Sequence, residues 1–145
     1  MYRHILIPTD GSTLSSTAIQ NAMLFARDAG AKVTVATVVE PFHIFSVESK
    51  QLSETRSAYE KHAKEGVEQY LQEAARHAET LGVPRELVQV EHQLPYKAIP
   101  DTAAAKGCDL IAMASHGRRG AAALLLGSET VKVLTHSTIP VLVYR

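Results

Sequence analysis

Short runs rich in β-branched residues alternate with longer amphipathic segments along this chain of 145 residues, and the alternation restricts the fold more than any other feature. The short runs predict strands at residues 4–9, 32–39, 87–93, 108–115 and 139–145. The longer segments, with apolar residues three and four apart, predict helices at about 12–30, 53–81, 96–107 and 128–136. We therefore expect an α/β fold with a five-stranded parallel sheet and helices on both faces.

Turn and cap residues separate these elements. Ser12 or Thr13 can cap the first helix, and Gly30 can close it in the left-handed conformation. The segment 41–51 has no clear period, which predicts a long loop. Pro100 is tolerable only near the start of the third helix, where its missing amide has no partner to lose. The second and fourth strands lack polar alternation, as expected of strands buried on both sides.

Composition narrows the class of protein. Apolar residues make up 46% of the chain, enough for a core, and the length predicts one domain over residues 1–145. The formal net charge is zero, which argues against a nucleic-acid partner. No apolar run approaches the roughly 18 residues of a spanning helix, so we expect no membrane insertion. The single cysteine, Cys108, excludes an intramolecular disulfide, and the N-terminus does not resemble a signal peptide; together they predict a cytoplasmic protein.

The ligand site of a parallel sheet lies beyond the carboxyl ends of its strands, where the strand order reverses. Three stretches follow predicted strand ends there: Pro-Thr-Asp at 8–10, Val-Val-Glu at 38–40 and Met-Ala-Ser-His-Gly at 113–117. A carboxylate at Asp10 can accept hydrogen bonds from ribose hydroxyls or hold a metal on phosphates. The residues at this edge are thus compatible with a nucleotide.

Two glycine turns, at Gly117 and Gly127, are separated by nine residues. Several backbone amides must converge to hold a phosphate, and glycine permits that close approach. The second turn precedes a predicted helix start, where Ser128 and Thr130 can add hydroxyl donors. The alternative is that both are ordinary loop glycines, so the residues alone leave a phosphate site and two plain loops equally open.

Three stretches together resemble the universal stress protein family over the whole chain: HILIPTDGS at 4–12, MASHGRRGAAALLLGSET at 113–130 and STIPVLVYR at 137–145. The resemblance implies a five-stranded Rossmann-like fold of the adenine nucleotide alpha hydrolase type. It also implies a homodimer in many members. In one subgroup it implies binding of ATP or AMP, with or without Mg²⁺.

The motif of that nucleotide-binding subgroup is glycine, two residues, glycine, nine residues, then glycine followed by serine or threonine. Its positions here are Ala114, Gly117, Gly127 and Ser128, so alanine replaces the first glycine. If that position requires a positive φ, alanine costs about 1 kcal/mol. If it requires only a small side chain, the extra methyl group is tolerated.

The resemblance implies a role for each matching residue. Asp10, beside Pro8 and Thr9, would contact adenine or ribose, and the backbone of Val38 would pair with the adenine edge. The remaining implied contacts, to ribose and phosphates, are Met113, Ala114, Gly117, Gly127, Ser128, Glu129 and Thr130. We expect Glu129 to offer only its backbone amide, with its carboxylate turned outward, because that charge repels phosphate.

No catalytic residue and no metal-ligating cluster is predicted. The adjacent Ser115 and His116 rarely suit a nucleophile and its base, the seven histidines lack ligand spacing, and no P-loop is present. We expect binding of ATP or AMP in a stress-response or regulatory role without efficient catalysis, with no downstream partner identified. Two alternatives remain: a dimeric interaction scaffold that binds no nucleotide, and a slow Mg²⁺-dependent ATP hydrolase.

The last predicted strand is strongly apolar and lies at the chain end, where it can form a sheet edge. Two such edges pairing antiparallel about a twofold axis would bury Val141 and Val143. The alternative is an ordinary strand covered by a helix. The family resemblance favours a homodimer through this strand.

Overall fold

The computed structural model describes residues 1–41, 49–116 and 125–145, without the side chains of residues 49–55 and 59. Its strands are β1 (His4–Pro8), β2 (Lys32–Val39), β3 (Arg85–Glu91), β4 (Leu110–Ala114) and β5 (Val141–Tyr144). Its helices are α1 (Thr13–Ala29), α2 (Ser49–Leu81), α3 (Pro95–Lys106) and α4 (Ser128–His136). Strand and helix alternate in the predicted order.

The strands form one parallel sheet in the order β3-β2-β1-β4-β5. β1 is central, with Ile5 opposite Val33 of β2 on one side and opposite Leu110 of β4 on the other. After β1 the chain adds β2 and β3 outward, then crosses back and adds β4 and β5 beyond the other side of β1. The strand order therefore reverses between β1 and β4, where a ligand site is expected. The predicted fold class is confirmed.

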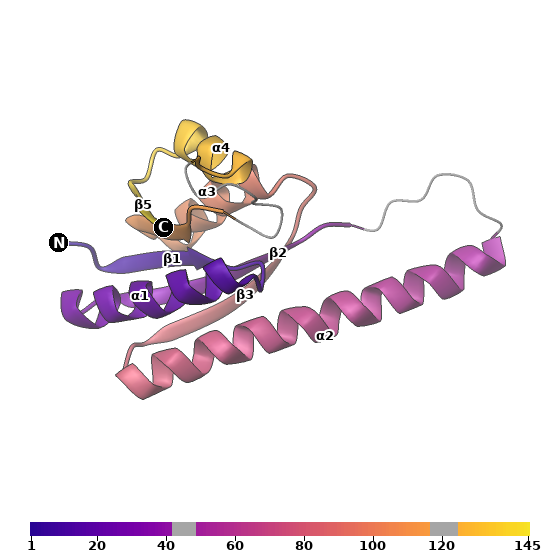
Figure 1. Cartoon of the computed structure of the whole chain (residues 1–145), viewed down its shortest axis with the longest axis horizontal. Coiled ribbons are helices and arrows are strands. Elements are labelled where there is room, and N and C mark those ends of the chain that lie inside the picture. The colour runs from indigo at the N-terminus through magenta and orange to yellow at the C-terminus, as the bar shows by residue number, and fades with distance from the viewer. Residues whose placement is uncertain (42–48, 117–124) are drawn as a thin grey trace.

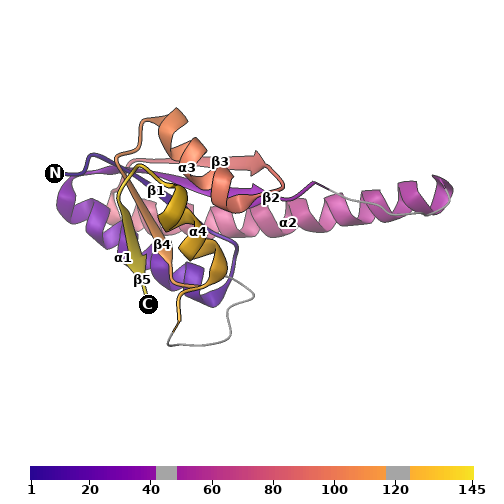
Figure 2. The same ribbon diagram turned by 90° about the horizontal axis from the view of Figure 1, so that it is seen from above.

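Helices cover both faces of this sheet (Figures 1 and 2). α1 and α2 pack on one face around Met23 and Leu71. α3 and α4 pack on the other face around Ile99 and Val133. All of β4 is buried, as predicted for a strand covered on both sides. The N-terminal part of α2 extends beyond the sheet (Figure 1). Among the described helices, none is both long and apolar enough to cross a bilayer.

Several boundaries differ from the prediction by two residues or more: β3 spans residues 85–91 rather than 87–93, and β5 begins at residue 141 rather than 139. The differences at α2 and β4 have identifiable reasons. α2 begins at Ser49 rather than at residue 53, because its first residues are polar and carry no apolar period that could show the start. Much of the predicted loop, residues 42–48, lies outside the described residues. β4 begins two residues later than predicted, because the amide of Cys108 still bonds to the carbonyl of Ala103 (2.8 Å) at the end of α3.

The predicted caps of α1 are confirmed, whereas the proline in α3 is placed differently. Ser12 accepts a hydrogen bond from the amide of Ser15 at 3.1 Å, and Gly30 ends α1 with a φ of 67°. α3 starts with Pro95, so Pro100 stands inside the helix rather than at its start. There it removes one helical hydrogen bond, which the sequence analysis did not expect.

The carboxylate of Asp109 fastens the start of β1 to the start of β4. It accepts hydrogen bonds from the amides of Arg3 (2.9 Å) and His4 (3.0 Å). Burial raises the pKa of Asp109, but the amide donors outweigh burial and hold the pKa below its ordinary value. The ionised carboxylate therefore stabilises the fold, and the protonated acid does so less.

We predict that Asp109→Asn lowers the free energy of unfolding by about 1 kcal/mol at pH 7, because a neutral amide oxygen accepts more weakly than a carboxylate. The folded-state pKa of Asp109 lies below the unfolded one, so the stabilisation is complete above roughly pH 4 and is lost as the pH falls through the folded pKa. Urea denaturation of both proteins between pH 7 and pH 2 tests this. A difference that stays constant down to the lowest pH would contradict it.

Candidate functional site

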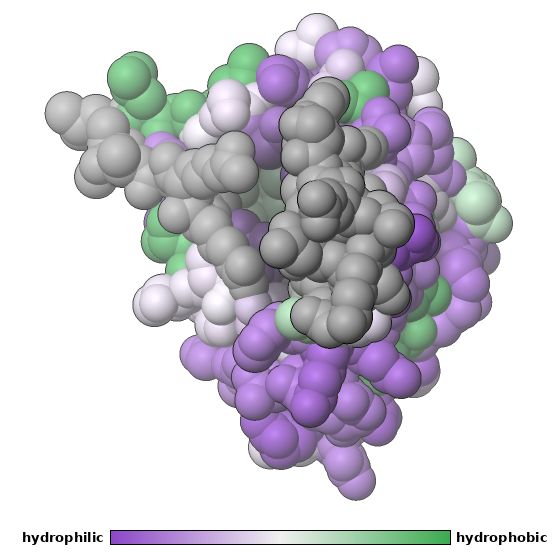
Figure 3. Space-filling view, turned by 90° about the vertical axis from the view of Figure 1, so that its right-hand side faces the viewer, coloured by the Kyte–Doolittle hydropathy of each residue, from purple (hydrophilic) through white to green (hydrophobic). Residues whose placement is uncertain are grey.

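A cavity of about 680 Å³ opens at the carboxyl edge of the sheet, at the ends of β1, β2 and β4. That volume suits a small-molecule ligand. The predicted site residues that line the cavity are Pro8, Thr9, Asp10, Val38, Met113, Ala114, Gly127, Ser128, Glu129 and Thr130. Gly117 lies outside the described residues. Figure 3 views the molecule from the end at which β2 leaves the sheet, where hydrophilic side chains cover most of the described surface.

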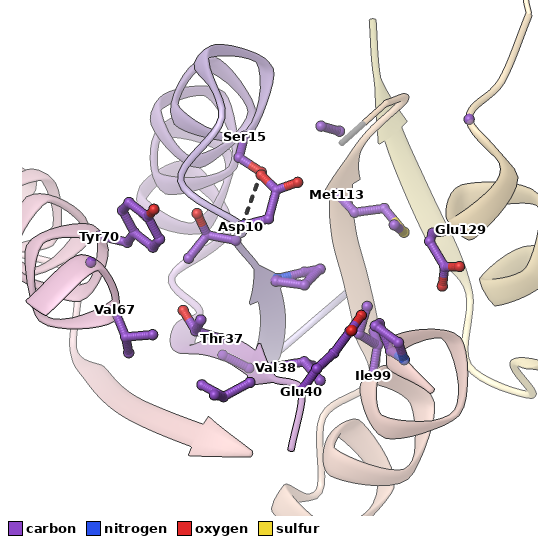
Figure 4. A pocket seen from close by; sticks show the side chains of 18 of the residues that line it. Asp10, Ser15, Thr37, Val38, Glu40, Val67, Tyr70, Ile99, Met113 and Glu129 are labelled. Atoms are coloured by element: carbon purple, nitrogen blue, oxygen red, sulfur yellow. Dashed lines mark hydrogen bonds between the residues drawn. The ribbon is translucent and has the colours of Figure 1, made fainter. Parts of the chain in front are cut away.

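The turn after β1 holds the carboxylate of Asp10 in one orientation. Its Oδ1 accepts hydrogen bonds from the amide of Ser12 and the hydroxyl of Ser15, each at 2.9 Å. Figure 4 shows Ser15 beside Asp10. The amide of Gly11 donates to Thr9 Oγ1 at 3.2 Å, and Gly11 has a φ of +77°, which other residues rarely adopt. The Asp-Gly pair, a turn signal in the sequence, therefore presents a fixed carboxylate at the cavity wall.

Helix α2 packs onto this turn through Tyr70. A Cβ on Gly11 would lie 2.1 Å from ring atoms of Tyr70, so the ring occupies the space that any side chain would need. The hydroxyl oxygen of Tyr70 lies 3.3 Å from where a Cβ on Gly66 would be. Two glycines thus let one tyrosine ring fill the space between α2 and the turn that carries Asp10.

The same helix forms a wall of the cavity that the sequence analysis did not predict. The residues of this wall share one helical face: His62, Ala63, Gly66, Val67 and Tyr70. Figure 4 shows Val67 and Tyr70 on α2, across the opening from Glu129. Apolar residues at helical spacing show that one face of a helix is buried. They do not show whether that face packs on the core or lines a cavity. Gly66, unfavourable inside a helix, is the one available signal of a close approach.

The other lining residues absent from the prediction are Ser15, Ala36, Thr37, Val39, Glu40, Pro95, Ile99 and His116. Most of them neighbour a predicted residue in sequence or in the sheet. The prediction therefore found the strand ends correctly and missed how far the lining extends along each element.

The structure answers the question raised by Ala114. This residue ends β4 and pairs with Tyr144 of β5, so its backbone is extended. Extended backbone suits any residue and involves no positive φ. The alanine in place of the first motif glycine therefore causes no backbone strain, and the residue lines the cavity.

Hydrogen bonds fasten the start of α4 to the end of β4. The hydroxyl of Thr130 donates to the carbonyls of Ala114 (3.0 Å) and Ser115 (3.1 Å), and the amide of Gly127 donates to Ser115 at 2.7 Å. A Cβ on Gly127 would lie 3.0 Å from that carbonyl oxygen, so the close approach favours glycine. The Thr130 hydroxyl was expected to donate to a phosphate; here its one proton goes to the backbone instead.

The N-terminus of α4 opens into the cavity without a side-chain cap. Its N-cap residue is Gly127, which makes no side-chain cap hydrogen bond. These amides carry the partial positive charge of the helix end, which favours an anion. Ser128 is exposed and lines the cavity, so its hydroxyl can add a further donor.

Two buried side-chain oxygens in the described part of the chain have no hydrogen-bond partner, Thr37 Oγ1 and Glu129 Oε2, and both residues line the cavity. Glu129 was expected to turn its carboxylate outward. Its side chain is 46% exposed, with Oε1 3.6 Å from Nζ of Lys132, and only its Oε2 is buried. Folded proteins satisfy nearly all buried polar atoms, so these two oxygens are available to a ligand or to water in the cavity.

The other side chains that could take part in chemistry are not placed to act in the cavity. Oγ of Ser115 lies 3.0 Å from Nδ1 of His116, but only His116 lines the cavity, so the hydroxyl is not presented there. Burial raises the pKa of Cys108 to about 11, which keeps it a neutral thiol at the opposite end of β4. Within residues 1–41, 49–116 and 125–145, no three His, Cys, Asp or Glu side chains are placed to hold a metal.

Known proteins match this chain over its whole length. The family model of the universal stress protein family matches residues 1–145. Universal stress protein MJ0531 of Methanocaldococcus jannaschii is 31% identical over 145 residues, covering 100% of this chain and 83% of that protein. The structure of hypothetical protein MJ0577 from the same organism has a TM-score of 0.80 and 28% identity, over 99% of this chain and 95% of that chain. A universal stress protein solved in complex with cAMP has a TM-score of 0.73 and 25% identity, over 99% and 97% of the two chains.

We predict that Thr37→Val raises the free energy of unfolding by about 1 kcal/mol, because it removes a buried hydroxyl without a partner and keeps the β-branched shape. Thr34→Val in the same strand is the matched control. Its hydroxyl lies 2.7 Å from Nε2 of the buried His4, so losing it should lower the free energy of unfolding by about 1 kcal/mol or more. Equal effects of the two substitutions in urea denaturation would refute the assignment of the Thr37 hydroxyl.

Proposed function

Because this chain belongs to the universal stress protein family, we propose that it binds an adenine nucleotide, ATP or AMP, in the cavity at the carboxyl edge of the sheet. It acts as a cytoplasmic stress-response or regulatory protein without efficient catalysis. The observation that carries the proposal is the uncapped N-terminus of α4, which faces the same cavity as the carboxylate of Asp10. A helix end suits a phosphate, and a carboxylate suits the donors of ribose or adenine.

The proposal places the nucleotide along the strand ends. The residues at adenine and ribose are Pro8, Thr9, Asp10, Val38, Met113 and Ala114. Those at the phosphates are Gly117, Gly127, Ser128, Glu129 and Thr130, acting mainly through backbone amides. The cAMP complex of a relative supports an adenine nucleotide as the ligand class. The extended backbone of Ala114 supports binding despite the missing motif glycine.

We predict that Asp10→Asn weakens AMP binding about tenfold, because a charged acceptor becomes a neutral one. The carboxamide oxygen can still accept the amide of Ser12, so the turn keeps its shape. Isothermal titration calorimetry measures the affinity, after a denatured sample has been checked for nucleotide that co-purifies. Ser15→Ala is the control: it removes a hydrogen bond to Asp10 and leaves the charge, so the affinity should stay within about threefold.

The same titrations separate the alternatives. Saturable binding by the wild-type protein and by Asp10→Asn with equal affinity would remove Asp10 from the site. No binding by wild-type protein that carries no nucleotide would contradict the proposal and point to an interaction scaffold. Sustained phosphate release from ATP with Mg²⁺ would instead identify a hydrolase.

A homodimer through β5 is part of the proposal. β5 lies at one edge of the described sheet, pairs with β4 alone there and is only partly buried. Its free edge can pair with a second copy about a twofold axis, burying more of Val141 and Val143. Val141 already packs on the core beside α3 and α4, which leaves Val143 as the better position for a test.

We predict that Val143→Lys converts the dimer to a monomer, because a lysine on an edge strand opposes pairing between copies. Sedimentation velocity measures the oligomeric state. Gln89→Lys, on the exposed face of the opposite edge strand β3, is the control and should remain dimeric. If Val143→Lys stays dimeric while both variants keep the wild-type circular dichroism, the interface lies elsewhere.

A further inference from the structure

The cavity extends onto both faces of the sheet at the end of β2. Successive side chains of a strand point to opposite faces. Ala36 and Val38 contact the core on the face covered by α3 and α4, whereas Val39 packs on the core beneath α1 and α2. Thr37 therefore shares the face of Val39, and all four residues line the cavity. The cavity thus continues around the edge of the sheet from one face to the other.

The α2 compartment is the part of the cavity between β2 and α2. The residues that line it are Thr37, Val39, Ala63, Gly66, Val67 and Tyr70. Figure 4 shows Thr37 and Val67 across the opening from Met113. Met113 and Val38, two of the proposed nucleotide contacts, lie with the core of the opposite face. The proposed nucleotide contacts none of the six residues, so the α2 compartment is available to a second ligand.

Small residues on α2 keep this compartment open. Ala63 and Gly66 are three positions apart on the helix, and both line the cavity. A Cβ on Gly66 would lie 3.3 Å from the hydroxyl oxygen of Tyr70, so even alanine would crowd the ring. Glycine inside a helix costs about 1 kcal/mol relative to alanine. Its presence in α2 therefore preserves space beside Tyr70 at the expense of helix stability.

The α2 compartment is apolar apart from one buried hydroxyl. Val67 is 6% exposed and Thr37 is 3% exposed. Oγ1 of Thr37 has no hydrogen-bond partner among the described residues. A buried water needs roughly two to four polar partners, which valine and alanine side chains do not supply. A ligand with an apolar body and one polar atom would satisfy both the walls and the hydroxyl.

The residues of the compartment favour a neutral, aromatic ligand. None of the six is charged, and the titratable neighbours on the same elements, Glu40 and His62, are exposed residues of the cavity wall. An ionised group moved into the compartment would lose hydration without gaining an ion pair from these six residues. The ring of Tyr70 offers an aromatic partner, which favours a ligand with a ring over an aliphatic chain.

We propose that the α2 compartment binds a small uncharged aromatic molecule that carries one hydroxyl or amine group, at the same time as the nucleotide binds beyond the strand ends. The hydroxyl of Thr37 pairs with the polar group, and Val67 and Tyr70 contact the ring. This site goes beyond the proposed nucleotide site, and only the simultaneous occupancy rests on that proposal. Thr37 is thereby a binding residue whose unpaired hydroxyl lowers the stability of the free protein.

Phenol is the probe, and toluene, which replaces its hydroxyl with a methyl group, is the matched ligand. Titrations of the ¹⁵N-labelled full chain are followed by NMR, with and without saturating AMP. Phenol should shift the amides of residues 37–39 and 63–70 in both titrations. Its affinity with and without AMP should agree within about twofold, because the two ligands occupy separate positions.

Three variants test the residues of the compartment. Thr37→Val should lower the affinity for phenol about fivefold relative to that for toluene, because only phenol loses a hydrogen bond. Ala63→Leu fills the compartment and should weaken binding of both ligands at least about tenfold, with AMP affinity kept within about twofold. Gln69→Leu adds the same side chain at an exposed position of α2 and should bind phenol as the wild-type protein does. Thermal unfolding of each variant checks that the fold is kept.

The outcomes separate this site from the nucleotide site. Displacement of phenol by AMP, or phenol shifts confined to residues 113–116 and 125–130, would place the ring in the nucleotide site and overturn the proposal. Absence of phenol binding, or wild-type binding by both Thr37→Val and Ala63→Leu, would also overturn it. If AMP does not bind, the nucleotide site is contradicted, while phenol binding that is lost in Ala63→Leu still supports the α2 compartment.

Discussion

The pairing of β1 with β2 on one side and with β4 on the other is the constraint on which the cavity depends. It brings the ends of three strands together although β4 follows β1 by about a hundred residues of sequence. Because the strands are parallel, their connections leave from the same edge and diverge to opposite faces. The space between the diverging connections is lined by Asp10, Thr37 and Ala114 from the three strand ends.

The attachment of α4 to β4 explains how the second glycine turn is used. Gly127 approaches the Ser115 carbonyl closely, and Thr130 bonds to the last carbonyls of β4, so this part of the motif holds the helix end in place. The first-turn amides are left without a side-chain cap. Small and hydroxyl residues here therefore stabilise the structure, and the backbone they position supplies the anion-binding groups.

Helix α2 shapes the cavity in two ways, although most of its long sequence is polar. Tyr70 lies against Gly11 in the turn that orients Asp10, and its neighbours Val67 and Gly66 line the cavity themselves. A side chain at position 11 would displace this ring. The geometry of the Asp10 carboxylate is thus set partly by a helix residue, Tyr70, that lies sixty positions further along the sequence.

Local patterns in the sequence determined the order of elements, the caps at Ser12 and Gly30, the buried character of β4 and the strand ends that line the cavity, because each depends on residues close together in the chain. They did not show the start of α2, whose first residues have no apolar period, nor the role of Pro100, which depends on where α3 begins. Only the tertiary structure decided that the hydroxyl of Thr130 bonds to β4, and that Thr37 and Glu129 bring buried oxygens to one cavity. These outcomes depend on the packing of distant segments against one another, and a periodicity in one segment does not report what lies opposite it.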